Sequence, residues 1–234
     1  MKNAPYPIPD GFSFLHWVDP YRTHQPVLFE VANRCKGPIV EFGCGEGSTE
    51  LLHGVSERRG IPLLTLETDA EWMDRYAPAY ESTLHRFELV TDWEEALEAP
   101  RWDEQRWGLA FVDQAPWEAR AATVRRVRLT TEYVVVHDCD YLPAAGLMGT
   151  MIWPLNGPSD RGERHYDDVF LSWKEFFPLE PWPLSTTGPP TLVGSNVHDV
   201  STIDVSYKDY QPSRARRWVH TGAAAVARRL SRST

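Results

Sequence analysis

The chain has 234 residues, of which 42% are apolar and 24% charged, and these values describe a globular protein that can bury a large core. No stretch approaches the ~18 consecutive apolar residues of a membrane span, and the first residues lack the apolar run of a signal peptide. We therefore expect a cytoplasmic protein without an integral membrane segment. Three cysteines, Cys35, Cys44 and Cys139, have neither CxxC nor zinc-ligand spacing, which argues against a disulfide framework or structural zinc.

Charge is distributed unevenly along the chain. Residues 211–234 contain six of the 24 basic residues and no acid, which leaves 18 basic against 33 acidic residues, a net charge of −15, for residues 1–210. A field of this sign repels a phosphate backbone, so nucleic acid is not expected as a partner of the folded body. The basic end is interpreted as a solvated terminus, with contact to an anionic lipid or a protein partner as the alternative.

Short β-branched runs alternate with helical patterns from residue 25 onward, which predicts βα units on a parallel sheet with helices on both faces. Helices are expected at 25–35, 48–60, around 72–76, at 92–97, from 116 to 127 and at 167–176. Strands are expected at 39–42, 63–66, 87–90, 109–112, 133–136, 191–194 and 202–206, the last two as a terminal antiparallel hairpin. We divide the chain into an N-terminal extension and helix (1–36), a main domain (37–210) with a lid loop (139–165), and a basic tail (211–234).

The most informative stretch, residues 39–49, reads Ile-Val-Glu-Phe-Gly-Cys-Gly-Glu-Gly-Ser-Thr. A glycine-rich turn between a strand and a helix lets the backbone approach a ligand. The dinucleotide fingerprint needs Gly-x-Gly-x-x-Gly, whereas the glycines here are Gly43, Gly45 and Gly47, with Glu41 two residues before the first. This order resembles the first motif of the Rossmann-like S-adenosylmethionine-dependent methyltransferases. The resemblance implies a Rossmann-like seven-stranded fold, glycines facing the methionine and ribose part of the cofactor, and Glu41 holding its amino group.

Three further residues are candidates for cofactor binding. Glu67 ends the second strand, where an acid can accept hydrogen bonds from both ribose hydroxyls; the alternative is a place in the N-terminal cap of the next helix, which Asp69 can also fill. Asp92 follows the third strand, where the family often places a residue near adenine, but it also begins a capping-box pattern. Trp93 is a candidate for stacking on adenine, with core packing as the alternative.

Two acids follow neighbouring strands of the predicted sheet. Asp113 ends the fourth strand and Asp138 follows the fifth, so both are expected at the edge that carries the glycine turn. Two close carboxylates repel each other unless a proton, a cation or a basic group compensates them. Mg²⁺ bound by Asp113 and Asp138 satisfies this need; helix and loop capping are the alternatives.

Asp113 and Asp138 also indicate which branch of the methyltransferases the chain resembles. A strand ending in Asp113, a helix and then Val-Val-Val-His-Asp resemble the cephalosporin-hydroxylase-like and macrolide-sugar O-methyltransferases, several of which use Mg²⁺. In that branch the fourth strand commonly ends Asp-Gly-x-His, with the histidine as general base, whereas this chain has Asp113-Gln114-Ala115-Pro116. His137 is the nearest replacement, as base or metal ligand, although a histidine at a strand end is often only hydrogen-bonded.

These patterns predict an S-adenosylmethionine-dependent methyltransferase that O-methylates a small polar acceptor such as a sugar or natural-product hydroxyl. The expected catalytic residues are His137, Asp113 and Asp138, and a homo-oligomer is compatible with the sequence. Two alternatives stay open. The first is a different reaction of S-adenosylmethionine, such as lyase or aminocarboxypropyl-transfer chemistry, and the second is a non-catalytic binding subunit.

Overall fold

The computed structural model describes residues 6–17, 19–139, 166–178 and 188–210. The predicted basic tail (211–234) and, apart from Cys139, the predicted lid loop (139–165) lie outside the described residues. Among the described helices, none is long and apolar enough to cross a membrane.

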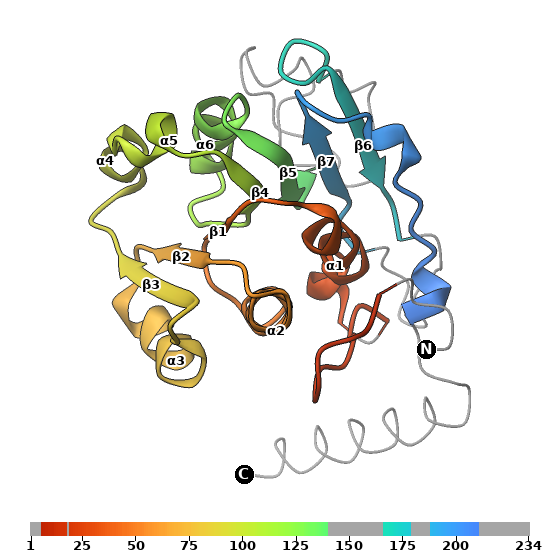
Figure 1. Cartoon of the computed structure of the whole chain (residues 1–234), viewed down its shortest axis with the longest axis horizontal. Coiled ribbons are helices and arrows are strands. Elements are labelled where there is room, and N and C mark those ends of the chain that lie inside the picture. Colours follow the sequence, from red (N-terminus) through yellow and green to blue (C-terminus); the bar gives the residue numbers. More distant parts are fainter. Residues whose placement is uncertain (1–5, 18, 140–165, 179–187, 211–234) are drawn as a thin grey trace, which may run out of the picture.

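Seven strands form one sheet in the order β3-β2-β1-β4-β5-β7-β6 (Figure 1). The strands β1 to β5 are parallel, β7 is antiparallel to β5, and β6 is antiparallel to β7. Their bounds are Ile39–Phe42 (β1), Leu63–Glu67 (β2), His85–Leu89 (β3), Trp107–Val112 (β4), Thr131–His137 (β5), Ser172–Phe176 (β6) and Thr191–Ser195 (β7). This arrangement confirms the predicted Rossmann-like, mostly parallel sheet with an antiparallel end.

Helices cover both faces of the sheet, with α1, α2 and α3 on one side and α4, α5 and α6 on the other (Figure 1). Their bounds are Gln25–Arg34 (α1), Thr49–Arg59 (α2), Ala70–Tyr80 (α3), Trp93–Glu98 (α4), Arg101–Glu104 (α5) and Ala119–Val127 (α6). The helix expected from residue 116 begins only at Ala119, and α5 was not expected. Other predicted helix ends agree where a local signal exists. Gly60, for example, ends α2 with a left-handed φ of 66°, a conformation that glycine adopts without strain.

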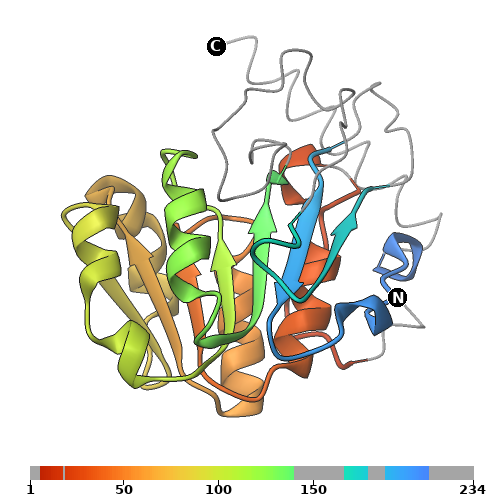
Figure 2. The ribbon, with the colours of Figure 1, turned by 90° about the horizontal axis from the view of Figure 1, so that it is seen from above.

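Strand alternation divides the core into two clusters. Leu109, Phe111 and Val135 pack toward α1 and α2, whereas their neighbours Val112 and Val136 pack toward α6. The same period of two carries on to the polar residues at the strand ends. Figure 2 shows the parallel strands side by side, with their carboxyl ends at one edge of the sheet.

Two of the predicted elements near the C-terminal end of the domain are wrong. Residues 172–176, expected within a helix, form edge strand β6. The helical spacing of the apolar residues Tyr166, Val169 and Phe170 belongs to a single turn, in which the Tyr166 carbonyl accepts from the amides of both others. The strand expected at 202–206 is absent from this described segment, because the Asp199 side chain accepts from the Ser201 amide and starts a 3₁₀ turn instead. The antiparallel end is therefore the β6–β7 pair.

Candidate functional site

The glycine turn between β1 and α2 is tightly packed at Gly43 and open at Gly45. Gly43 has φ of 86°, and a Cβ there would lie 2.7 Å from the Gln114 Cα, so only glycine fits. A Cβ on Gly45, in contrast, would meet no atom within 4 Å. The Gly45 amide donates to Thr49 Oγ1 over 2.8 Å, which ties the turn to the first residue of α2.

Glu41 is fully buried beneath this turn. Its carboxylate accepts from the Thr49 hydroxyl at 3.1 Å and from the Thr65 hydroxyl at 2.7 Å. Burial raises the pKa of Glu41 to about 7, although hydroxyl donors oppose this shift. In this geometry Glu41 fixes the turn from below, through Thr49; its predicted contact with the amino group of a cofactor stays a prediction.

The buried Glu41 carboxyl should make stability depend on pH. The folded protein keeps this proton up to a pH of about 7, whereas an ordinary glutamate loses it near 4.5. The folded state therefore binds more protons, and its free energy of unfolding should fall by about 3 kcal/mol as pH rises between these values. Urea denaturation at pH 5, 6, 7 and 8 measures this loss against Glu41→Gln, which lacks the titrating group. A stability difference between the two proteins that stays constant with pH would contradict the assignment; Glu50→Gln controls for loss of a surface carboxylate.

Glu67 stands at the end of β2 beside the glycine turn. Its carboxylate accepts from the backbone amides of Cys44 at 3.0 Å, Thr68 at 2.8 Å and Asp69 at 3.1 Å. Asp69 caps α3 by accepting from the Trp72 amide. The capping role that was the alternative for Glu67 is therefore filled by Asp69. The Cys44 thiol at 3.6 Å and the Thr68 hydroxyl at 3.5 Å donate to it as well, so protein groups already occupy the roughly four acceptor positions of the carboxylate. A ribose hydroxyl would have to displace one of these weaker donors.

Asp92 and Trp93, the two residues expected near adenine, have structural roles. Asp92 caps α4 by accepting from the Glu95 amide at 2.8 Å, while its side chain remains exposed. Trp93 is buried, donates its indole N–H to the Ala115 carbonyl at 2.7 Å and packs near Phe42. The capping and core alternatives are thus observed, and the adenine contacts of both residues stay predictions.

The second predicted group assembles across the ends of β4 and β5. By strand alternation, Asp113 and His137 share the side of Phe111 and Val135, which is the side of α1. His137 Nδ1 lies 3.3 Å from Asp113 Oδ2, and its Nε2 lies 3.4 Å from Asp138 Oδ1. Asp138 has a left-handed φ of 50°, which aspartate tolerates better than most residues. The structure therefore brings His137, Asp113 and Asp138 together, as predicted from the sequence.

Arg120 of α6 connects the two carboxylates. Its guanidinium lies 2.9 Å from Asp113 Oδ1 and 3.5 Å from Asp138 Oδ2, and it donates to the carbonyl oxygens of Gln114 and His137 at 3.0 and 2.9 Å. Arg120 is buried and belongs to the interior of the protein, and not to a solvated basic face of α6. Because a basic group already compensates the acids, the expected Mg²⁺ between Asp113 and Asp138 has a competitor. Asp113 also does not cap α6, which begins at Ala119.

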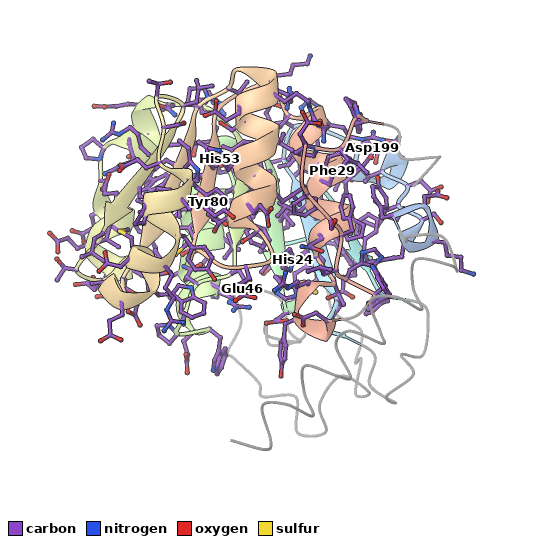
Figure 3. All side chains as sticks on the ribbon, turned by 90° about the horizontal axis from the view of Figure 1, so that it is seen from below. His24, Phe29, Glu46, His53, Tyr80 and Asp199 are labelled. Carbon is purple, nitrogen blue, oxygen red and sulfur yellow. The ribbon has the colours of Figure 1, made fainter. Side chains whose placement is uncertain are left out.

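His24, at the start of α1, is a site residue that the sequence analysis missed. Its ring stacks edge-on against His137 with 4.2 Å between centroids, and it packs so closely on the glycine turn that a Cβ on Gly47 would lie 2.6 Å from it. In Figure 3, His24 and Glu46 lie together at the end of the molecule that carries this turn. A lone histidine before a helix gives no sequence signal, because only the tertiary fold brings it to the strand ends.

Burial and charge set opposite protonation preferences for the two histidines. Burial, followed by the nearby His137, holds the pKa of His24 well below its usual range. Burial would also lower the pKa of His137, but the negative charges of Asp113 and Asp138 outweigh it and raise that pKa. The pKa of Asp113 is lowered because His137 and Arg120 outweigh its burial. The site therefore combines a neutral imidazole with an imidazole that its two acidic neighbours favour in the charged form.

The sheet order, the helices on both faces and the glycine turn at the carboxyl edge define a fold of the methyltransferase type. No protein-family profile and no curated protein sequence matches the chain. Solved structures with this fold include the methyltransferase domain of bacterial CtHen1-C, with TM-score 0.50 and 11% identity over 76% of this chain and 98% of that one. A Klebsiella pneumoniae protein described as a candidate O-methyltransferase has TM-score 0.52 and 15% identity over 77% of this chain and 83% of its own. At these identities the likeness is one of fold.

Proposed function

We propose that this protein transfers a methyl group from S-adenosylmethionine to a hydroxyl of a small polar acceptor. One observation carries the proposal: His24 contacts both the glycine turn at Gly47 and the ring of His137. The turn proposed for the cofactor therefore adjoins a cluster of acid–base residues. A methyl donor and an acceptor oxygen need this kind of neighbourhood, because transfer requires the two reacting atoms in line at close range.

The open space beside Gly45 and the position of Glu67 at the end of β2, next to the turn, support cofactor binding there. We assign the backbone of Gly43, Gly45 and Gly47 to the methionine and ribose part, and Glu67 to a ribose hydroxyl. The bound cofactor supplies an electrophilic methyl group. The remaining work of the protein is to orient the acceptor and to remove its proton.

We assign proton removal to His137, with Asp113 orienting its ring through the 3.3 Å contact. Asp113 is also the more accessible member of the cluster, because a quarter of its side chain is exposed while that of His137 is nearly enclosed. An acceptor hydroxyl would therefore meet Asp113 first. Asp138 faces the other ring nitrogen of His137 and holds the ring from the far side.

Calorimetry on the full chain tests the cofactor assignment. We expect S-adenosylmethionine and S-adenosylhomocysteine to bind and NAD not to bind, because the turn lacks the Gly-x-Gly-x-x-Gly spacing of dinucleotide sites. Each titration is run with and without Mg²⁺. Binding of NAD in preference to both S-adenosyl compounds would overturn the proposal.

Product analysis then separates methyl transfer from other chemistry of the same cofactor. We expect incubation with a panel of sugar and natural-product hydroxyl compounds to release S-adenosylhomocysteine together with a methylated acceptor. Release of methylthioadenosine would support the lyase or aminocarboxypropyl-transfer alternative instead. Cofactor binding without any turnover across the panel would support a binding subunit.

A further inference from the structure

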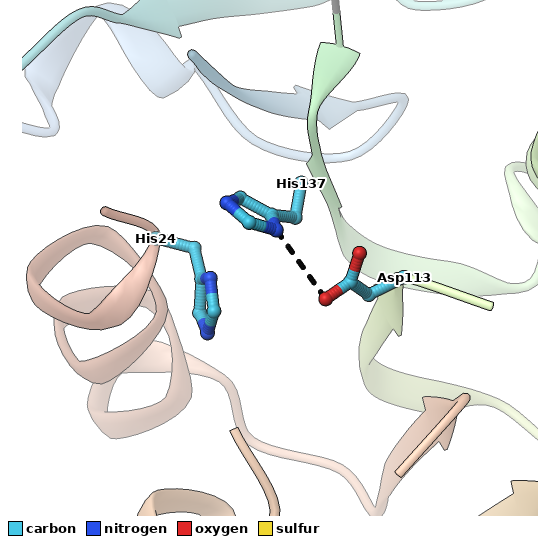
Figure 4. A group of neighbouring side chains, drawn as sticks. All are labelled: His24, Asp113 and His137. Carbon is cyan, nitrogen blue, oxygen red and sulfur yellow. Dashed lines mark hydrogen bonds and ion pairs between the residues drawn. The ribbon is translucent and has the colours of Figure 1, made fainter. Parts of the chain in front are cut away.

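The strongest unassigned feature is a group of three possible metal ligands from separate elements: His24 before α1, Asp113 after β4 and His137 at the end of β5. One ligand atom of each lies within 4.8 Å of the others (Figure 4). We propose that His24, Asp113 and His137 bind a divalent transition-metal ion such as Zn²⁺. This inference rests on the proposed function only in its last step, the role of the ion toward an acceptor.

His24 is the observation that points to a ligand. It is buried, with 2% of its surface exposed, and neither ring nitrogen makes a hydrogen bond of good geometry among the described residues. The backbone of Gly47 is the polar group that lies against the ring. A buried polar group without a partner destabilises a fold, so its retention calls for a partner that the described residues do not provide. Figure 4 shows the His24 ring beside the imidazole of His137 and the carboxylate of Asp113.

The two oxygens of Asp113 have different partners. Oδ1 pairs with Arg120 at 2.9 Å, whereas Oδ2 faces His137 Nδ1 at 3.3 Å. Two ligands held 2.0–2.1 Å from a tetrahedral zinc ion are about 3.3 Å apart. The Oδ2–Nδ1 spacing therefore already suits two ligands of one ion, and Arg120 fixes the carboxylate from the other side. His24 must approach by no more than roughly 1.5 Å to complete the set.

Asp138 takes the role of an outer partner and not of a ligand. Metal-binding histidines commonly donate their second ring N–H to a carboxylate, which fixes the ring and its tautomer. Asp138 Oδ1 is buried, lies 3.4 Å from His137 Nε2 and accepts no hydrogen bond among the described residues. The hydrogen-bond partner of Nε2 is the Thr23 hydroxyl, at 3.4 Å. Ligation through His137 Nδ1 leaves an N–H on Nε2, which the Thr23 hydroxyl oxygen accepts now and which Asp138 Oδ1 could accept after a small shift.

Charge and donor type indicate which ion fits. Asp113 and Asp138 contribute two negative charges and Arg120 one positive charge, so once both histidines are neutral ligands the site has a net charge of −1, which a cation can neutralise. Two imidazoles and one carboxylate suit Zn²⁺, Fe²⁺ or Mn²⁺ better than Mg²⁺, which prefers oxygen ligands alone. Three protein ligands also leave a position open for an acceptor hydroxyl. A bound ion would supply Lewis-acid help by lowering the pKa of that hydroxyl, and His137 would then serve as a ligand in place of its proposed role as base.

Titration calorimetry with Zn²⁺ alone and Mg²⁺ alone, on the full chain after removal of metal with EDTA, tests the site. We expect one equivalent of Zn²⁺ to bind more tightly than Mg²⁺. Asp113→Asn and His24→Gln should each weaken zinc binding by at least about 100-fold, and Asp138→Asn by about 10–100-fold. His24→Phe keeps a ring in the same space and should lose binding equally, which separates ligation from packing.

His198→Gln is the matched control, because this histidine stacks on Tyr133 near the start of β5, away from the cluster. Zinc affinity that is unchanged in His24→Phe and Asp113→Asn, or no zinc binding by the native chain, would overturn the inference. Binding of S-adenosylmethionine to the metal-free protein is measured separately. Cofactor binding without zinc binding rejects the metal site alone, whereas zinc binding without cofactor binding rejects the proposed function alone.

Discussion

Replacing His137 by glutamine is expected to lower kcat for methyl transfer by about 10²–10⁴-fold, the usual contribution of a positioned general base. Glutamine can keep hydrogen bonds to Asp113 and Asp138 but cannot accept a proton at neutral pH. Release of S-adenosylhomocysteine in the presence of an accepted hydroxyl compound measures the loss. Affinity for S-adenosylmethionine should stay close to native, because His137 lies outside the glycine turn.

His198→Gln again provides the comparison, since it makes the same chemical change at the other end of β5. We expect it to retain native turnover. Equal turnover in the two variants would show that the cluster at the ends of β4 and β5 is not the reaction centre. If His137→Gln instead loses cofactor affinity and turnover together, the ring supports the cofactor and the base must be sought elsewhere.

The second large effect concerns stability. Arg120→Met should lower the free energy of unfolding by about 3 kcal/mol, since it removes the guanidinium from between Asp113 and Asp138 and the donor from three carbonyl oxygens. We take the low end of the 3–5 kcal/mol range for a broken buried ion pair, because a quarter of the Asp113 side chain is exposed. Urea denaturation at neutral pH measures the change.

Arg125→Met on the same helix controls for the loss of a positive charge and a long side chain. As a substitution outside any buried ion pair, it should change stability by no more than about 0.5 kcal/mol. Zinc binding gives a second measurement on this variant. If Arg120→Met binds Zn²⁺ with native affinity, Asp113 does not need the guanidinium to hold its position. A loss of stability no larger than that of Arg125→Met would contradict the buried ion-pair network itself.

Local sequence signals were sufficient for most of the sheet. The strands β1, β2 and β4 are mostly apolar, with Glu41 and Thr65 as internal polar residues, and glycine or an acid marks where each one ends. Their C-terminal ends could therefore be predicted closely. The signal failed at β6, where buried Tyr166, Val169 and Phe170 mimic a helical face over a single turn. An edge strand with mostly half-buried residues carries little apolar periodicity of its own.

The site was predictable where it depends on strand ends and unpredictable where it depends on helices. Asp113 and His137 follow from the parallel order, because neighbouring strands end at one edge. Arg120 is one of several arginines around α6, and nothing local distinguishes the buried one from those that face solvent. His24 comes to the site only because α1 packs across β4 and β5. Tertiary packing therefore determines which polar residues join the acids.

The pairing of β5 with β4 fixes which way each end residue points. His137 faces α1 and Asp138 faces Arg120, and a slip of one residue would exchange these sides. An imidazole would then meet the guanidinium, and a carboxylate would meet His24. Insertions or deletions inside β5 should therefore abolish the cluster even if the sheet still forms, so length changes in homologues are expected in the connections and not in this strand.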